Sequence, residues 1–150
     1  MGEQVVYQPW RGPWQVAFIP LPLHWMTTIF HKPKAPWQHC LLMQPGNDGS
    51  SWLIAEWSFL GYSATIQSPD RVARLHAIIE RSGALLAFEG SDTPPKPSIW
   101  HAWQPTTCVT YARSILGLPP RSFTYAADRF YDELLGLGAI ELIPPPQRRA

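Results

Sequence analysis

Apolar residues form two strand-length runs on either side of a turn-rich segment in the first half of the chain. The runs are QHCLLMQ and WLIAEW, and the segment between them, PGNDGSS, consists almost entirely of turn-forming residues. This pattern predicts a β-hairpin over about 38–57. The following run, YSATI, alternates weakly and predicts a third strand.

Two segments carry apolar residues at the spacing of amphipathic helices. The first is expected to begin after Ser68 as N-cap, with Pro69 in its first turn, and to end before Gly83. The second is expected from about Thr124 to Leu137. With the hairpin, these helices predict an α+β fold in which a small antiparallel sheet packs on helices.

Proline interrupts several of the remaining segments. WQVAFIPLP, residues 14–22, is therefore expected as an edge strand or an extended cover. ALLAF, residues 84–88, is expected as a further strand, and residues 91–105 as a structured loop. With 150 residues, of which 45% are hydrophobic, the chain supports one core. We therefore expect residues 1–150 to form a single domain with extended Pro-rich N- and C-terminal segments.

The balanced charge and the lack of recognisable targeting motifs argue against several classes of partner. The chain has 12 Lys and Arg against 11 Asp and Glu, without the basic patch that nucleic-acid binding requires. Its start, MGEQVVYQPWRGPW, carries neither a signal peptide nor a myristoylation motif, so we expect a protein that is cytoplasmic when made and not bound to a membrane. Cys40 and Cys108 could form one disulfide, but 2 cysteines are too few for a secreted disulfide scaffold. A reducing compartment is expected.

The segment TTCVTYARSILGLPP contains the most informative residue, Cys108. It predicts a short helix capped by Thr106 or Thr107 and ended by Gly117, with Cys108 at its first or second position. The free N–H groups and the dipole at a helix start favour a thiolate and can hold an oxyanion. A buried cysteine is also common as a small apolar core residue, so a structural role is the alternative.

A nucleophilic cysteine needs a base, and the base needs an orienting acceptor. Folding the hairpin about residues 47–48 brings His39 close to Glu56 across the two strands. A slip of one residue would instead place Glu56 opposite Cys40, on the face away from His39. Glu56 lies in an apolar run, where a carboxylate requires a partner. His101, in the loop before the cysteine, is a second candidate base.

The order His39, Glu56, Cys108, with the cysteine opening a helix after the hairpin, resembles a circularly permuted papain-like domain of the NlpC-like group. The matching stretches are WQHCLLMQP, SSWLIAEW and TTCVTYARSILGLP, and the resemblance spans about residues 37–137. It implies that Cys108 is the nucleophile, His39 the base and Glu56 the orienting acid. Gln104, which precedes the cysteine closely, would be an oxyanion donor. Many such domains have a small or aromatic residue just before the cysteine, whereas this chain has a threonine.

Domains of this kind are encoded by bacteria and tailed bacteriophages, and the resemblance implies two alternative functions. The first is a cysteine-dependent amidase or endopeptidase that cleaves peptidoglycan, or a related amide, by acylation of Cys108. The second is a catalytically inert structural or adaptor module, such as a virion or tail component. The partners would then be a peptidoglycan peptide or glycan, or other virion proteins. Four aromatic residues are expected to line the groove or the docking surface: Trp37, Trp57, Trp100 and Trp103.

No metal or other cofactor is expected. His39 and Cys40 are adjacent, but neighbours on a strand point to opposite faces and do not readily ligate one ion. The sequence has no Cys-x-x-Cys, no His-Glu-x-x-His and no glycine-rich phosphate loop.

Overall fold

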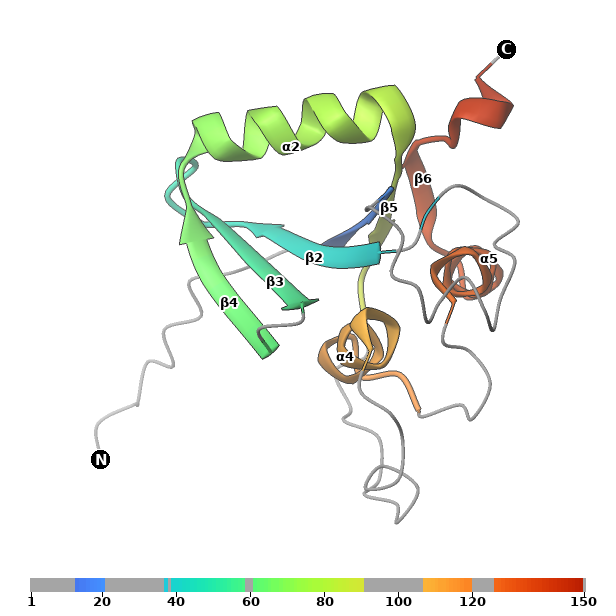
Figure 1. Cartoon of the computed structure of the whole chain (residues 1–150). Helices are drawn as coiled ribbons and strands as arrows, with labels where there is room; N and C mark the ends of the chain where they lie inside the picture. Colours follow the sequence, from blue (N-terminus) through green and yellow to red (C-terminus); the bar gives the residue numbers. More distant parts are fainter. Residues whose placement is uncertain are drawn as a thin grey trace, which may run out of the picture.

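The computed structural model describes residues 13–20, 37, 39–58, 61–90, 107–119 and 126–149. Within these residues, six strands form one antiparallel sheet in the order β4-β3-β2-β1-β5-β6. Helix α2 covers one face of the sheet, and α4 and α5 lie on the other (Figure 1). The fold is therefore α+β, with a sheet between two helical layers. In chain order the elements are β1 (Trp14–Ile19), β2 (His39–Pro45), β3 (Trp52–Ser58), β4 (Gly61–Gln67), α2 (Pro69–Ser82), β5 (Ala84–Phe88), α4 (Cys108–Ile115), α5 (Ala127–Gly136), β6 (Ile140–Ile143) and the 3-10 helix η1 (Pro146–Arg148).

Strand β1 lies inside the sheet, between β2 and β5, so the expectation of an edge strand or cover is wrong. Its side chains alternate between two cores: Val16 and Phe18 face α4 and α5, while Ala17 and Ile19 face α2. A strand buried on both faces reads as a continuous apolar run. The prolines at positions 13 and 20 fall just outside the strand, so they remove no hydrogen bond from its ladders.

The predicted hairpin is present as β2 and β3, and its turn is organised by Asp48. The Asp48 carboxylate accepts hydrogen bonds from the backbone N–H of Ser50 (3.0 Å), the N–H of Ser51 (2.9 Å) and the Ser51 hydroxyl (2.7 Å). Gly49 follows with φ of 70°, a conformation that favours glycine. The turn is therefore centred one residue later than the sequence suggests.

This turn shifts the pairing of β2 with β3 by two residues from the expected register. The ladder runs from Pro45 with Trp52 to Leu42 with Ala55 and ends there. Glu56 thus lies beyond the last pair and is not directly opposite His39. A shift of two residues keeps each side chain on its face of the sheet, because side chains alternate with period two.

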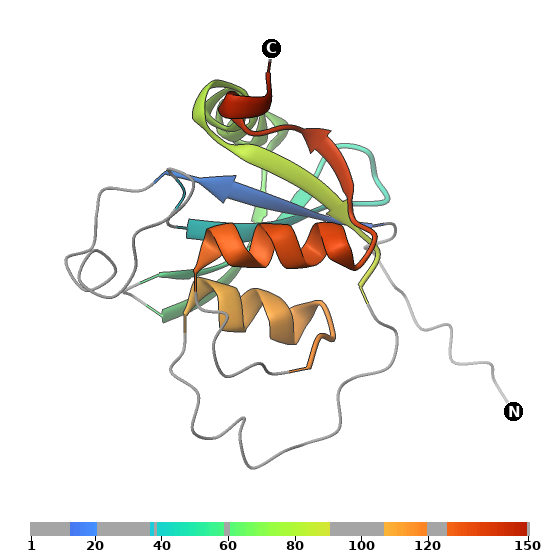
Figure 2. The ribbon, with the colours of Figure 1, turned by 90° about the vertical axis from the view of Figure 1, so that its right-hand side faces the viewer.

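The helices follow their local signals closely. Ser68, Pro69 and Gly83 stand at the N-cap, first position and C-cap of α2, as predicted. The predicted start of the last helix, Thr124, lies outside the described residues, and Leu137 is the C-cap of α5. Helices α4 and α5 lie side by side (Figure 2).

Two features of the C-terminal region were not predicted. Strand β6 extends the sheet beyond β5, next to a register irregularity at Leu85 and Leu86. The chain then returns to α2, where the Arg149 guanidinium donates hydrogen bonds to the carbonyls of Ile79 and Gly83 at 3.1 and 2.7 Å. In the described part of the chain, no helix has the length and apolar character needed to cross a lipid bilayer.

Candidate active site

Cys108 is the first residue of α4, at the point where this helix packs against β2 and β3. Thr107 caps the helix: its hydroxyl accepts from the Thr110 N–H at 3.2 Å, while the Thr110 hydroxyl accepts from the Thr107 N–H at 2.7 Å. This reciprocal pair fixes the first turn. The Cys108 sulfur is therefore held at the positive end of a helix, where a thiolate is favoured.

His39 lies between the cysteine and an acid. Its Nε2 is 3.6 Å from Glu56 Oε2, and an interaction with Cys108 also raises the pKa of its ring. The three residues come from β2, β3 and α4. The His39 side chain is 8% exposed and that of Glu56 is 41% exposed, so the imidazole is buried while the carboxylate reaches solvent. The structure thus brings together the three residues proposed for a triad.

The contact with Glu56 depends on the end of the β2–β3 ladder. Diagonal neighbours on one face of a sheet are within reach of long side chains. Glu56 and His39 lie beyond the last pair, Leu42 with Ala55, on the same face, so the glutamate reaches the ring from a diagonal position. A one-residue slip would have separated them, whereas the observed two-residue shift does not.

The environment of His39 favours its charged form. Burial disfavours the imidazolium, but hydrogen bonds and charge interactions with Cys108 and Glu56 together outweigh it and raise the pKa of His39 from 6.5 to about 9. In turn, the hydrogen bond with His39 lowers the pKa of Glu56, against the effect of burial. Around neutral pH, His39 is therefore protonated and Glu56 ionised.

The thiolate of Cys108 is stabilised by a second cysteine. A hydrogen bond from the Cys40 thiol is the largest influence that holds the pKa of Cys108 well below its usual range; burial opposes it, and His39 and the Cys40 backbone N–H add to it. The same sulfur contact, with burial, raises the pKa of Cys40 well above its usual range. The site therefore favours the charged forms of Cys108 and His39 and the neutral form of Cys40, a combination suited to nucleophilic attack by Cys108.

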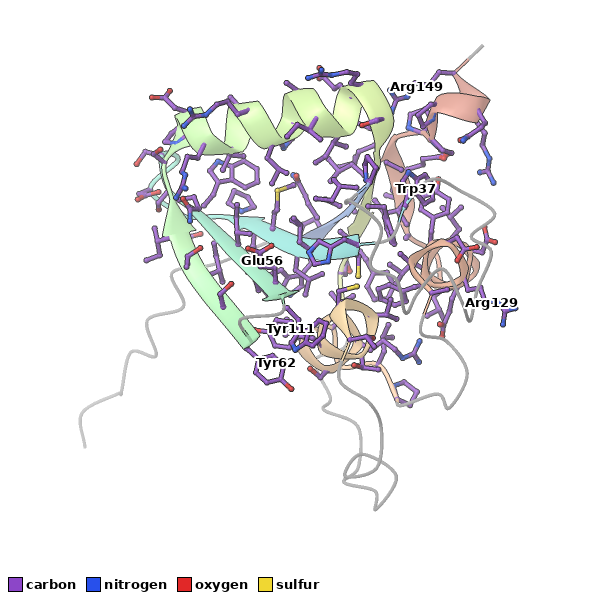
Figure 3. All side chains as sticks on the ribbon, viewed as in Figure 1. Trp37, Glu56, Tyr62, Tyr111, Arg129 and Arg149 are labelled. Carbon is purple, nitrogen blue, oxygen red and sulfur yellow. The ribbon has the colours of Figure 1, made fainter. Side chains whose placement is uncertain are left out.

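An aromatic pair, which the sequence did not single out, lies one turn along α4 from the cysteine. Tyr111 contacts Tyr62 of β4 with ring centroids 4.8 Å apart (Figure 3). Tyr62 is 62% exposed and pairs in the ladder with Trp57, one of the residues expected to line a groove. The sequence signal for this pair was the position of Tyr111, which follows Cys108 by three residues and so lies near it on the predicted helix.

Of the other residues predicted for the site, the structure describes only Trp37. Gln104, Trp100 and Trp103, like the alternative base His101, are outside the described residues. Trp37 is 3% exposed and belongs to the core, where its ring contacts Tyr131 at a centroid distance of 4.9 Å.

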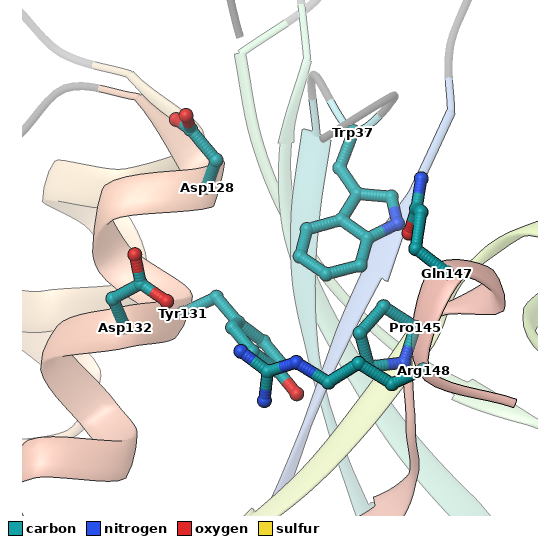
Figure 4. A pocket seen from close by; sticks show the side chains of 7 residues that line it. All are labelled: Trp37, Asp128, Tyr131, Asp132, Pro145, Gln147 and Arg148. Atoms are coloured by element: carbon teal, nitrogen blue, oxygen red, sulfur yellow. The ribbon is translucent and has the colours of Figure 1, made fainter. Parts of the chain in front are cut away.

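Trp37 also lines a cavity of about 230 Å³ between α5 and η1 (Figure 4). The triad residues are not part of its wall, so this cavity is distinct from the candidate active site. Its other lining residues are Asp128, Tyr131, Asp132, Pro145, Gln147 and Arg148.

Comparison of the chain with protein-family models, with curated proteins and with solved structures finds no match. Among the described residues, no group of three or more His, Cys, Asp and Glu side chains is arranged to hold a metal ion.

Proposed function

We propose that this chain is a cysteine-dependent amidase or endopeptidase in which Cys108 is the nucleophile. The observation that carries the proposal is the place of His39, whose Nε2 lies 3.6 Å from Glu56 Oε2 and whose pKa is raised by interactions with both Cys108 and Glu56. A nucleophile, a base in contact with it and an acid behind the base form the arrangement that covalent hydrolysis requires.

The reaction begins with attack of the Cys108 thiolate on the carbonyl carbon of an amide. Backbone N–H groups in the first turn of α4 stabilise the oxyanion. Protonated His39 gives its proton to the leaving amine nitrogen, which yields a thioester on Cys108 and a free amine. His39 then takes a proton from water, the water attacks the thioester, and the acid product leaves. Glu56 orients the imidazole and stabilises its charged form.

The proposed substrate class is a peptidoglycan peptide or a related amide. The order of the base strand, the acid strand and the nucleophile helix is the one that suggested a permuted papain-like domain of the NlpC-like group. Tyr62 and Tyr111 offer aromatic faces next to the site, and such faces suit contact with the sugar or peptide of a cell-wall fragment.

The limited exposure of Cys108 favours the second candidate function, a catalytically inert structural module. The residue is 8% exposed, so a substrate reaches the sulfur only through a narrow opening or after a side-chain movement. This suits an inert papain-like module, such as a virion or tail component, in which the triad residues serve packing and the partners are other virion proteins.

Digestion of purified peptidoglycan separates the two candidates. The wild-type protein is expected to release new amino groups, and Cys108→Ala to release none while retaining its melting temperature. Ser114→Ala, on the same helix, is the matched control and should keep activity. A wild-type protein that is inert on several peptidoglycan types, yet assembles into a larger particle with or without Cys108, would support the inert module instead.

A further inference from the structure

Cys40 is a thiol that the proposed hydrolysis does not use as a reacting group. It lies on β2 next to His39 and is paired across the sheet with Phe18 of β1. Its side chain lies in the same core cluster as that of Cys108, and interaction with Cys108 raises the pKa of its thiol.

The two cysteines differ in exposure and in charge. Cys108 is 8% exposed and Cys40 is 1% exposed, so a small reagent from solvent reaches Cys108 first. Cys108 is also the sulfur whose pKa is lowered, while the pKa of Cys40 is raised. Because peroxides react with thiolates, the first oxidation is expected at Cys108 and not at Cys40.

We propose that Cys40 and Cys108 form a peroxide-responsive pair, in which Cys108 is oxidised first and Cys40 then closes a reversible disulfide with it. The geometry points to this role because both side chains lie in one core cluster where α4 packs on β2, with Cys108 8% exposed and Cys40 1% exposed. The proposal concerns thiol chemistry alone, so it stands apart from the proposed hydrolase activity.

The chemistry balances in two steps, with a hydroperoxide as the oxidant. In the first, the Cys108 thiolate attacks the terminal oxygen of the hydroperoxide; the O–O bond breaks, an S–O bond forms, and the leaving alkoxide or hydroxide takes a proton. In the second, the Cys40 sulfur attacks the Cys108 sulfenic sulfur; the S–S bond forms, the S–O bond breaks, and the thiol proton leaves with hydroxide as water. Cys40 and Cys108 together lose two electrons to the peroxide.

Oxidation of Cys108 in the first step favours the attack by Cys40 in the second. While Cys108 is a thiolate, its hydrogen bond and charge raise the pKa of Cys40 and keep this thiol protonated. Conversion of Cys108 to a neutral sulfenic acid removes the charge that raises the pKa of Cys40, so the Cys40 thiol more readily gives its proton to the departing hydroxide. Burial of the pair also limits access of a second peroxide, so disulfide closure competes well with further oxidation.

Closure of the disulfide has a direct consequence for the site. It occupies the Cys108 sulfur and ties the start of α4 to β2, so nucleophilic attack stops until a reductant reopens the bond. Under the proposed function, oxidised protein would be an inactive hydrolase that dithiothreitol restores.

Mass spectrometry of the full-length protein tests this proposal. Reduced protein is treated with a small excess of hydrogen peroxide, and is then unfolded and alkylated with iodoacetamide. The wild type is expected to lose both alkylatable thiols, to yield a linked Cys40–Cys108 peptide, and to recover both thiols after dithiothreitol. With Cys40→Ser, Cys108 is expected to be trapped by dimedone as the sulfenic acid and then to proceed to a sulfinic acid that dithiothreitol does not reduce.

The measurement on the wild-type protein shows whether the Cys40–Cys108 disulfide forms, even if the Cys40→Ser variant folds poorly. Irreversible oxidation of Cys108, with Cys40 still alkylatable after unfolding, would overturn the proposal. Formation of the disulfide in a protein that does not cleave peptidoglycan would contradict the proposed function and leave this inference intact. Cleavage of peptidoglycan without disulfide formation would contradict this inference and leave the proposed function intact.

Discussion

Nε2 of His39 lies 3.6 Å from Oε2 of Glu56, although the two residues are not opposite each other in the ladder between β2 and β3. The glutamate reaches the ring from a diagonal position, beyond the last pair of the hairpin. The contact joins a buried base to a carboxylate that is 41% exposed. Because the Glu56 side chain is partly exposed, its carboxylate stabilises the charged form of His39 while contributing little to packing.

This geometry predicts a selective effect of Glu56→Gln. The amide keeps the shape of the side chain but not the charge that stabilises the imidazolium, so hydrolysis is expected to fall by as much as about 10⁴-fold, the order seen when the acid of a Ser-His-Asp triad is neutralised. The melting temperature is expected to change little. Steady-state kinetics and thermal unfolding measure the two effects, with Glu80→Gln on α2 as control. A large loss of stability with unchanged thiol reactivity would assign Glu56 to the fold.

The raised pKa of His39 sets the alkaline limit of the reaction. His39 must be protonated to deliver a proton to the leaving amine, and it loses this proton as the pH rises through about 9. Activity is therefore expected to decline above about pH 9. In a Glu56→Gln variant with residual activity, this limit should move to lower pH, because one cause of the raised pKa is gone. An alkaline limit near the ordinary value for histidine in the wild type would contradict the assignment.

The sequence predicts elements whose signals are local and misses those that depend on distant contacts. Helix α2 follows from Ser68, Pro69 and Gly83. The interior place of β1 is missed because the predicted segment, residues 14–22, includes Pro20 and Pro22, whereas the strand ends at Ile19. Strand β6 is missed because only its pairing with β5 marks it as a strand.

In the candidate site, likewise, one contact follows from a local sequence signal and another does not. The contact of His39 with Glu56 followed from the hairpin, but the register was displaced by two residues because Asp48 moves the turn. The contact of Cys40 with Cys108 joins a strand and a helix far apart in the chain, and the sequence contains no local signal for it.

The ion pair between Arg113 and Glu133 is expected to hold the nucleophile helix in place. Arg113 is 2% exposed, and its guanidinium joins the Glu133 carboxylate of α5 and the Pro119 carbonyl. Arg113→Ala removes a buried cation beside a carboxylate, so the free energy of unfolding should fall by about 3–5 kcal/mol. Denaturant unfolding measures this. The double variant Arg113→Met with Glu133→Leu should recover much of the loss, and its failure to do so would argue against an electrostatic cause.

Arg149 is expected to stabilise the end of α2. Its guanidinium donates to the carbonyls of Ile79 and Gly83, which lie at the helix C-terminus. Arg149→Ala should lower stability by about 1–2 kcal/mol and speed amide exchange in the last turn of α2. Arg148→Ala, at the neighbouring and more exposed position, is the control. Equal effects of the two substitutions would show that the interaction with α2 is not specific to Arg149.

The rate of Cys108 alkylation as a function of pH, read by peptide mass spectrometry, tests most directly whether this thiol is activated. Cys108 is expected to react with iodoacetamide at pH values far below the usual thiol pKa of about 8.5, and His39→Ala is expected to remove this reactivity. Cys40 should stay unreactive in the same folded protein because it is buried and protonated. A Cys108 that follows a model thiol over roughly pH 5 to 9, with or without His39, would contradict the central claim that it is an activated nucleophile.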